Sequence, residues 1–329
     1  MTSTTSGTPA VQGHPAATSG KPVILVTGAD LAPQAVEILN GFEIVYAGKT
    51  PDEEGLVSLC QSTQPVGIIV RYGKISARIM DASARLRVIS KHGVGIDTID
   101  TAAAAERGIA VKAAIGANAD AVAEHTWALI LACAKGVPQL NDRMHDGHWD
   151  KATHKSLELK GRTLGLVGLG AIGRRAAQVG VAMGMRVIAF DPFASEVPGG
   201  VEVTSLEAVI EEAHILSLHC PLTPENRRMI NADTISRMRD GAILVNTARG
   251  GLVDEAALLA AIASGKLRSA GLDSFETEPL AGEHAFRGVA NVVLTPHIGG
   301  VTSDAYVSMG TAAARNVLAA LGDSEPQSH

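Results

Sequence analysis

The first third of the chain alternates between short apolar runs and amphipathic stretches. The runs have the length and composition of buried strands, and the stretches between them have the spacing of helices. Strands that alternate with helices at this pitch predict a parallel sheet with crossover helices. The strand-like runs are KPVILVTG, FEIVYAG, VGIIVRYG and LRVISKHGVGID, and the first two helix-like stretches are APQAVEILNG and EEGLVSLCQS. We therefore expect a small α/β unit that ends near residue 115.

A second region of the same character covers residues 116–298. It opens with a long helix expected from Asn118 to Lys135, whose early acidic residues suit the positive end of the helix dipole. The next segment gives a strand, a glycine turn, a helix and a strand, which is the βαβ unit of a dinucleotide fold. That segment is LKGRTLGLVGLGAIGRRAAQVGVAMGMRVIAFD, and further strands are expected in HILSLHCPLT, GAILVNTA, SAGLDSF and ANVVLTPHIGG.

The last apolar segment, SDAYVSMGTAAARNVLAALG, is a helix candidate with no strand after it. We expect it to pack on the first unit, which makes the substrate domain discontinuous: residues 21–115 plus 299–329, around an NAD-binding domain at 116–298. Residues 1–20 are rich in Thr, Ser, Gly, Pro and Ala and carry no targeting signal, so they are expected to form a disordered tail. The predicted fold class is α/β, with two Rossmann-like or flavodoxin-like domains built on parallel sheets.

Composition narrows the function classes. The net charge of −6 argues against general affinity for nucleic acid or for an anionic membrane surface. The apolar segment 113–137 is interrupted by Asp120, Glu124 and His125, which favours a buried helix over a membrane span. The three cysteines are widely spaced in apolar contexts, without pairing or metal-ligand spacing. We therefore expect reduced thiols, a cytoplasmic protein and no metal site.

A glycine motif, GLGAIG, lies directly between an apolar strand and a helix. In this context one glycine permits the tight turn, the next permits backbone approach to a pyrophosphate, and the third permits close packing of helix on strand. Asp191 follows the second strand, where a carboxylate can bind the ribose hydroxyls and repel a 2′-phosphate, which favours NAD over NADP. A strand-end turn residue is the alternative for Asp191. The motif predicts cofactor contacts from Gly168, Gly170, Ala171, Ile172 and Gly173.

Three chemically distinct residues each follow a predicted strand: Arg249 in ILVNTARGGLVDE, Glu278 in GLDSFETEPL and His297 in VVLTPHIGG. Each has a plain alternative: a surface arginine, a solvated acidic loop and a loop histidine. Together, after a dinucleotide fold, they indicate hydride transfer at a carbon next to a carboxylate. Arg249 would hold the anion and polarise the carbonyl, His297 would move the proton, and Glu278 would keep the histidine charged.

The first unit carries a second glycine turn after its strand RVIS. Its residues, Gly93, Val94 and Gly95, can present backbone amides to a carboxylate, although a plain tight turn is the alternative. Arg71 and Lys91 also follow strands of this unit and are candidates to face the same substrate; surface positions are their alternative. These residues are the predicted determinants of which acid is bound.

The sequence resembles the D-2-hydroxyacid dehydrogenases and is most similar to their 3-phosphoglycerate dehydrogenase branch. The resemblance covers about residues 23–321 and rests on long matching segments. They are KHGVGIDTID, NADAVAEHTWALIL, LKGRTLGLVGLGAIGR, HCPLTPENRRMI, NTARGGLVDEAAL, GLDSFETEPL and NVVLTPHIGG. The resemblance implies two domains around an NAD cleft, with Arg249, Glu278 and His297 as the catalytic residues.

The same resemblance implies further contacts. Asp273 would contact the nicotinamide carboxamide, and the residues along the cofactor would include Cys220, Pro221, Thr247 and Gly299. Asn118 would lie beside the substrate, and Arg71, Lys91 and Lys151 match basic positions that meet the substrate's phosphate. Lysine lacks the bidentate fork of arginine, however, which weakens the case for phosphate. No segment resembles the C-terminal regulatory domain of longer members, so feedback by serine is not expected.

The predicted function is NAD-dependent hydride transfer between a D-2-hydroxy acid and its 2-oxo acid, with 3-phosphoglycerate as one candidate substrate. The alternatives are a reductase of glyoxylate or hydroxypyruvate and, in another class, an NAD-binding corepressor or sensor. Glutamate rather than glutamine at Glu278 argues against the formate-oxidising relatives. The substrates are expected to be small anionic acids, and the resemblance implies a homodimer formed through the long helix from Asn118 and its neighbours.

Overall fold

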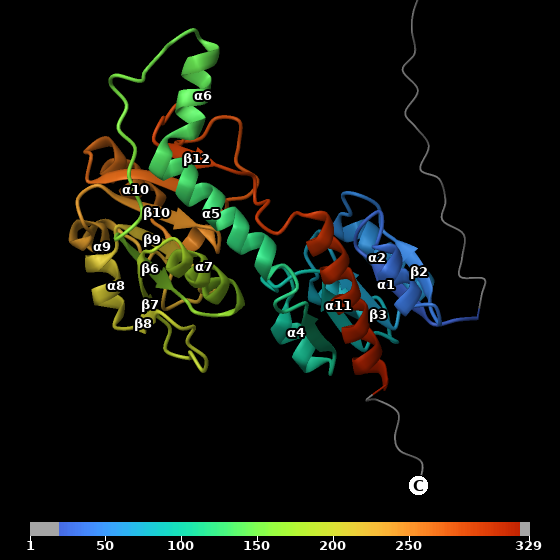
Figure 1. The fold of residues 1–329 in the computed structure, drawn as a ribbon. Helices are drawn as coiled ribbons and strands as arrows, with labels where there is room; N and C mark the ends of the chain where they lie inside the picture. The colour runs from blue at the N-terminus through green and yellow to red at the C-terminus, as the bar shows by residue number, and fades with distance from the viewer. Residues whose placement is uncertain (1–19, 323–329) are drawn as a thin grey trace, which may run out of the picture. The chain divides into compact units, whose positions relative to one another are not determined.

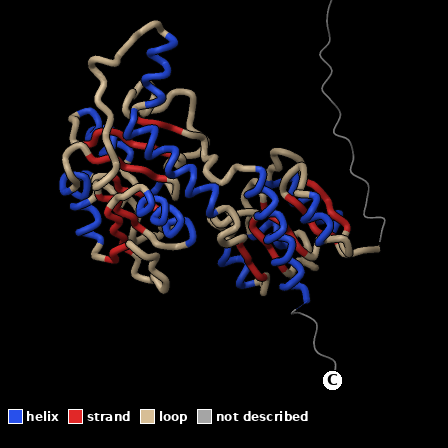
Figure 2. The backbone as a smooth tube through the Cα atoms, viewed as in Figure 1, coloured by secondary structure: helices blue, strands red, loops and turns tan. Residues whose placement is uncertain are grey.

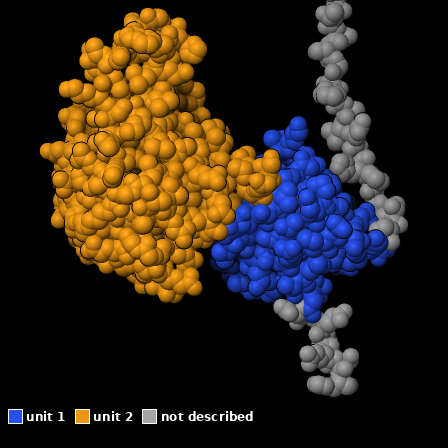
Figure 3. All heavy atoms as spheres, viewed as in Figure 1, with its two compact units in different colours: residues 1–117, 306–329 blue, residues 118–305 orange. Residues whose placement is uncertain are grey.

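The computed structural model describes residues 20–322, which form two compact units (Figure 3). Unit 1 contains the described residues up to Ala117 and those from Tyr306 onward, and unit 2 contains Asn118–Ala305. The sequence placed the two divisions at 115/116 and 298/299; the structure divides the chain two and seven residues later. The predicted tail at residues 1–20 lies, apart from Gly20, outside the described residues.

Unit 1 is a five-stranded parallel sheet with the strand order β2-β1-β3-β4-β5. Its strands are β1 (Val23–Val26), β2 (Glu43–Tyr46), β3 (Gly67–Val70), β4 (Val88–Lys91) and β5 (Ala110–Ala113). Its helices are α1 (Pro33–Ile38), α2 (Glu53–Thr63), α3 (Ala77–Asp81), α4 (Thr101–Glu106) and α11 (Ser303–Gly322). Figure 1 shows α11 beside strands that precede it by more than two hundred residues.

The strands of unit 1 are apolar on both faces because helices cover both faces. In β1, Ile24 and Val26 point toward one core, which contains Ala313 and Val317 of α11. Leu25 points toward the other core, formed with α2, α3 and α4. The last described helix, α11, therefore covers one face of this sheet.

Unit 2 is a seven-stranded parallel sheet with the order β12-β11-β10-β9-β6-β7-β8. Its strands are β6 (Thr163–Val167), β7 (Arg186–Phe190), β8 (Val201–Val203), β9 (Ile215–Leu218), β10 (Ala242–Asn246), β11 (Leu267–Leu272) and β12 (Val292–Leu294). Its helices are α5 (Ala119–Lys135), α6 (Val137–His145), α7 (Ala171–Ala182), α8 (Leu206–Glu212), α9 (Ala232–Arg237) and α10 (Glu255–Ala263), with a short 3₁₀ turn, η1 (Gly250–Leu252).

The strand order of unit 2 defines where a ligand can bind. The chain runs outward from β6 to β7 and β8, then returns to place β9 on the other side of β6. In open parallel sheets, ligands bind beyond the carboxyl ends of the strands at such a reversal. The glycine turn follows β6, and the Arg249, Glu278 and His297 loops follow β10, β11 and β12. The predicted α/β class with parallel sheets is therefore confirmed.

Two elements of unit 2 have no counterpart in the prediction: the short edge strand β8 and the helix α6. Figure 2 shows that α6 and the loop after it project from the rest of this unit. Val137, Met144 and Trp149 of this projection are exposed apolar side chains. None of the helices within residues 20–322 is both long and apolar enough to cross a bilayer.

Candidate active site

The turn between β6 and α7 requires glycine at two positions and leaves open space at a third. Gly168 has a φ of +102°, and a Cβ there would lie 2.7 Å from the carbonyl of His219. A Cβ on Gly173 would lie 2.2 Å from the carbonyl oxygen of Gly168. A Cβ on Gly170 meets no described atom within 4 Å. The fold therefore explains Gly168 and Gly173, whereas Gly170 keeps its side of the turn open, as close approach of a ligand requires.

Asp191, at the end of β7, holds this glycine turn in place. Its Oδ2 accepts a hydrogen bond from the backbone amide of Leu169 at 2.7 Å, and its Oδ1 accepts one from Phe193 at 2.8 Å. The sequence predicted ribose contacts for this half-buried carboxylate. The structure shows a second role for Asp191 that the sequence did not indicate: its carboxylate connects the ends of β6 and β7.

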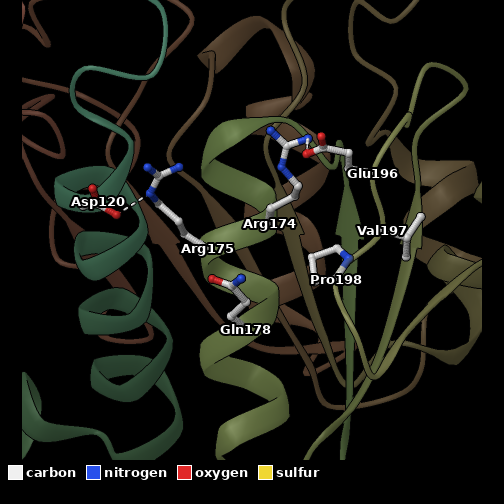
Figure 4. Close-up of a pocket in the computed structure, with 7 residues that line it drawn as sticks. All are labelled: Asp120, Arg174, Arg175, Gln178, Glu196, Val197 and Pro198. Carbon is white, nitrogen blue, oxygen red and sulfur yellow. Dashed lines mark hydrogen bonds and ion pairs between the residues drawn. The ribbon is translucent and has the colours of Figure 1, made fainter.

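A pocket of about 580 Å³ opens beside the first turns of α7 (Figure 4). Sequence reasoning missed it, although two arginines directly after the glycine motif were a visible signal. Arg175 is paired with Asp120 of α5, and Nη1 of Arg174 lies 3.7 Å from a carboxylate oxygen of Glu196. Both arginines already have carboxylate partners, so this pocket is not an open anion site.

The segment after β9 contributes buried and uncharged groups. Burial raises the pKa of Cys220 to about 11, which keeps its thiol protonated near neutral pH. Burial also lowers the pKa of His219 to about 4, and its Nε2 lies 3.0 Å from Oγ of Ser217. Pro221 follows and accepts a hydrogen bond from Asn226 at its carbonyl. This wall of the glycine turn is therefore neutral and packed, and it offers no acid or base.

His297 and Glu278 form a hydrogen-bonded pair. Nδ1 of His297 lies 2.7 Å from Oε2 of Glu278, and the other carboxylate oxygen accepts the amide of Phe275 at 2.9 Å. The two side chains are 49% and 35% exposed, so solvent reaches both. Because Nδ1 is occupied by Glu278, Nε2 is the nitrogen that can exchange a proton with a ligand. The sequence predicted this partnership between residues on two different loops.

Asp273 holds the loop that carries His297. Its Oδ1 accepts hydrogen bonds from Thr295 Oγ1 at 2.6 Å and from the Ile298 amide at 2.8 Å, and its Oδ2 accepts the Gly299 amide at 2.8 Å. These donors lie on both sides of His297, whose φ of +54° is unusual for a residue with a side chain. Asp273 thus fixes the backbone at the histidine.

The surroundings of Asp273 keep it ionised although its side chain is only 3% exposed. Burial alone would raise the pKa of this carboxyl. The hydrogen bonds from His125, Thr295 and the two loop amides outweigh that effect and hold the pKa below its usual value. Nε2 of His125 on α5 lies 3.3 Å from Oδ1 of Asp273 and 2.9 Å from Oγ1 of Thr295. Sequence reasoning missed His125, although it lies in the matching segment NADAVAEHTWALIL.

Arg249 occupies a loop that is in backbone contact with the Glu278 loop. Asn246 at the end of β10 shapes it by donating to the carbonyl of Arg249 at 2.8 Å and accepting the amide of Ala248 at 3.0 Å. A Cβ on Gly250 would lie 1.9 Å from the carbonyl carbon of Phe275, so only glycine allows this approach. The arginine, the glutamate and the histidine therefore stand on loops at the carboxyl ends of three adjacent strands.

Comparison with known proteins identifies the family of the chain. The family model of the D-isomer specific 2-hydroxyacid dehydrogenase NAD-binding domain matches residues 127–299. The chain belongs to the D-2-hydroxyacid dehydrogenase family. It is an NAD-dependent oxidoreductase, as its relatives' names and the NAD-binding domain indicate.

Individual relatives of this dehydrogenase are similar over most of its length. A hydroxypyruvate reductase of Thermotoga maritima is 42% identical over 287 residues, which are 87% of this chain and 94% of that protein. A D-3-phosphoglycerate dehydrogenase of Mycobacterium tuberculosis is 37% identical over 91% of this chain, but the match spans only 57% of that protein. The crystal structure of the TT0316 protein from Thermus thermophilus matches with a TM-score of 0.84 and 38% identity, covering 93% of this chain and 98% of that one.

Two more predicted residues of this dehydrogenase are Thr247, which contacts α5, and Asn118, which lies beside Gly300. Oγ1 of Thr247 lies 2.9 Å from Oγ1 of Thr126 on α5, which ties the Arg249 loop to that helix. Asn118 precedes α5, and a Cβ on Gly300 would lie 2.7 Å from its Nδ2. The buried Oδ1 of Asn118 has no hydrogen-bond partner among the described residues. It is thus an acceptor available beside the His297 loop.

The predicted substrate residues are divided between the units. In unit 1, Arg71 follows β3, Lys91 is the last residue of β4, and the Gly93–Gly95 turn comes after it, where Gly93 has a φ of +148° and Val94 is exposed. Arg71 is not directed to solvent, because it pairs with Asp30. Lys151 lies in the loop after α6 of unit 2 and is exposed.

The glycine turn yields a matched pair of substitutions. Gly173→Ala should lower the free energy of unfolding by about 2 kcal/mol, because its Cβ forces the backbone at Gly168 to shift. Gly170→Ala should fold as stably as the unmodified protein but bind NADH more weakly, because its methyl group enters the open side of the turn. Chemical denaturation and NADH fluorescence titration measure the two effects. Equal stability of the two variants would contradict the assignment.

Asp273→Asn should lower the free energy of unfolding by about 2–3 kcal/mol at neutral pH, since an amide turns donors toward the loop amides. The folded-state pKa of Asp273 is lowered, so its carboxylate contributes stability above the unfolded-state pKa and loses it as pH falls through the folded value. The difference between the two proteins should therefore shrink as the pH falls below 3.8, the ordinary pKa of an aspartate carboxyl. Urea titrations at neutral pH and below that pKa measure it, with the exposed Asp146→Asn as the control.

Proposed function

We propose that this chain interconverts a short D-2-hydroxy acid and its 2-oxo acid by reversible hydride transfer with NAD. The observation that carries the proposal is the His297–Glu278 pair, 2.7 Å apart, on the loops after β12 and β11, with β11 adjacent to the strand β10 that leads to Arg249. An acid–base histidine, a carboxylate that orients it and a guanidinium form the set that carbonyl reduction requires. The substrate class is the small anionic acids that include hydroxypyruvate, glyoxylate and 3-phosphohydroxypyruvate.

The residues of unit 2 fit a bound dinucleotide. The open space at Gly170 admits a pyrophosphate to the amino end of α7, whose first residues are Ala171 and Ile172. Asp191 would meet the adenosine ribose, and the residues proposed along the remaining length are Cys220, Pro221, Thr247, Asp273 and Gly299. NAD supplies the hydride acceptor or donor when it is bound. The chain's own residues would orient it.

His297 would donate a proton from Nε2 to the carbonyl oxygen during reduction and take it back during oxidation. Glu278 fixes the ring through Nδ1, and its negative charge offsets the positive charge of the ring when both nitrogens carry protons. Asp273 acts on the same step by positioning, because it holds the backbone on both sides of the histidine. The loop therefore holds Nε2 of His297, the proposed proton donor, in one position.

Arg249 would bind the substrate carboxylate and polarise its carbonyl, which stabilises the oxyanion that develops during reduction. The amides of the turn formed by Gly93, Val94 and Gly95 would bind the same carboxylate. Asn118 offers a buried acceptor beside the His297 loop. Arg71, Lys91 and Lys151 are the residues proposed to meet the other end of the substrate.

His297→Ala should lower kcat for reduction of 2-oxo acids by about 10² to 10⁴ while NADH still binds, because only the proton donor is lost. Glu278→Gln keeps a hydrogen-bond acceptor at Nδ1 but removes the charge, so its loss should be smaller. Steady-state NADH consumption with hydroxypyruvate, glyoxylate and pyruvate measures both variants. Glu276→Gln, a carboxylate in the same loop that pairs with Arg227, is the control.

The outcome of that assay decides the proposal. Turnover of none of the acids by the unmodified protein, with NADH bound, would refute catalysis and favour an NAD sensor. Near-normal turnover by His297→Ala would instead refute the assignment of the proton donor.

We also propose that the protein is a cytoplasmic homodimer. The segment of α6 and the following loop presents Val137, Met144 and Trp149 to solvent, and Trp149 is 75% exposed. A second copy of the chain would cover this apolar surface. Burial raises the pKa of Cys60 and Cys133 to about 12, which suits unreactive thiols of a reducing compartment.

The double variant Met144→Asp/Trp149→Asp should shift the protein from dimer to monomer, because charges oppose burial of this surface. Sedimentation at micromolar concentration measures the mass. Phe193→Asp, which removes an exposed aromatic elsewhere in unit 2, should leave the mass unchanged. A monomeric unmodified protein would refute the dimer.

A further inference from the structure

Three side chains from distant parts of the sequence meet at the carboxyl edge of the unit 1 sheet. Asp30 follows β1, Arg71 follows β3 and Tyr306 belongs to α11. Nη1 of Arg71 donates to the backbone carbonyl of Asp30 at 2.7 Å and also pairs with its carboxylate oxygen Oδ1. The hydroxyl of Tyr306 donates to the same oxygen at 2.7 Å. Arg71, which is expected to bind the substrate, is therefore already paired with a carboxylate of the same chain.

Arg71 is held firmly in this pairing. Its guanidinium lies 5.0 Å from the ring centroid of Tyr306 and 5.3 Å from that of Tyr72. Its aliphatic part passes over Gly28, where a Cβ would lie 2.9 Å from Arg71 Cδ. The side chain is only 13% exposed. Packing on three sides leaves the guanidinium little freedom to turn from Asp30 toward another anion.

Asp30 is the exposed member of the group, with 67% of its side chain in contact with solvent. Hydrogen bonds from Tyr306 and Arg71 lower the pKa of this carboxyl, so it is ionised near neutral pH. His92, whose ring lies 5.5 Å from that of Tyr306, adds no charge, because burial lowers its pKa to about 4. Lys91 donates to the carbonyl of Arg71 at 3.2 Å. Asp30 thus presents carboxylate oxygens that carry a negative charge and accept hydrogen bonds, beside the cationic side chains of Arg71 and Lys91.

We propose that Asp30 is a specificity-determining residue that selects 2-oxo acids with an uncharged, hydroxyl-bearing end over those that end in phosphate. The inference rests on the proposed function, which assigns Arg71 and Lys91 to the substrate. It corrects the expectation that Arg71 is available to meet a phosphate. Within the proposed class, it names hydroxypyruvate as the preferred type of substrate and 3-phosphohydroxypyruvate as the rejected one.

The selection follows from charge and from hydrogen-bond type. A phosphate monoester carries a charge of about −1.5 to −2 near neutral pH and offers acceptor oxygens. Next to the Asp30 carboxylate it meets repulsion, and that carboxylate offers it no donor, since an ionised carboxylate only accepts. A hydroxyl group can donate to that carboxylate without either penalty. Rejection of one substrate by an unfavourable contact is a common route to specificity.

Asp30→Asn tests this proposal while keeping the arrangement, because the amide oxygen still accepts from Arg71 and Tyr306. The ratio of kcat/KM for 3-phosphohydroxypyruvate to that for hydroxypyruvate should rise by about tenfold, as expected for removal of one nearby like charge at a partly solvated site. Tyr306→Phe, which loosens Asp30 without removing it, should change the ratio less. Asp81→Asn is the matched control, because Asp81 also pairs with an arginine of unit 1, Arg107.

The kinetic outcomes decide the proposal directly. A higher kcat/KM for the phosphorylated acid in the unmodified protein would overturn it, and so would an Asp30→Asn ratio equal to that of Asp81→Asn. Either result would leave hydride transfer itself intact, because both are measured on turning-over enzyme.

A binding measurement separates this inference from the proposed function. Calorimetric titration of the NADH-loaded protein with 3-phosphoglycerate and with inorganic phosphate requires no turnover. Asp30→Asn should bind 3-phosphoglycerate about tenfold more tightly than the unmodified protein and Asp81→Asn do. If no 2-oxo acid is reduced but this shift appears, the catalytic proposal fails and the role of Asp30 stands. Unchanged affinity in Asp30→Asn overturns the role of Asp30.

Discussion

The buried carboxylate of Asp273 is the interaction on which the active site depends. An ionised group in so enclosed a position is costly unless donors surround it, and here the donors are Thr295, His125 and the amides of Ile298 and Gly299. Each donor comes from an element that must be fixed for catalysis. The need to satisfy one charge therefore determines the position of α5, the end of β11 and the loop of His297 relative to one another.

Backbone packing fixes the loops of Arg249 and Glu278. Gly250 lets the Arg249 loop touch the chain at Phe275, and the amide of Phe275 in turn holds the carboxylate of Glu278. Glu278 then orients His297 through Nδ1. The proposed catalytic groups thus belong to one continuous set of contacts within unit 2, in which the amide of Phe275 holds Glu278 and the carboxylate of Glu278 holds His297. Such support restricts motion of the groups that must meet the substrate.

The sequence predicted the parallel sheets and the Glu278–His297 partnership because both leave local signals. Apolar runs identify strands buried on both faces, and polar residues that follow adjacent parallel strands gather at one edge. The edge strand β8 is three residues long with a mostly exposed pattern, so it left no such signal. The pairing of Asp30 with Arg71 was missed for another reason. It joins residues 41 positions apart, and nothing local to either residue indicates the other.

Each unit has one carboxylate of particular interest, and the two differ in exposure. We relate the one in unit 2 to the reaction and the one in unit 1 to the choice of substrate. In unit 2 the carboxylate of Asp273 is buried and surrounded by donors of the protein, so its charge mainly fixes the loop of His297. In unit 1 the carboxylate of Asp30 is exposed, and its charge acts on whatever approaches. An arginine alone at that edge would favour anions, but an arginine already paired with a carboxylate has little net charge to offer. In this proposal, Asp30 determines which acid is accepted, because its pairing with Arg71 decides whether the guanidinium is available to an anionic substrate.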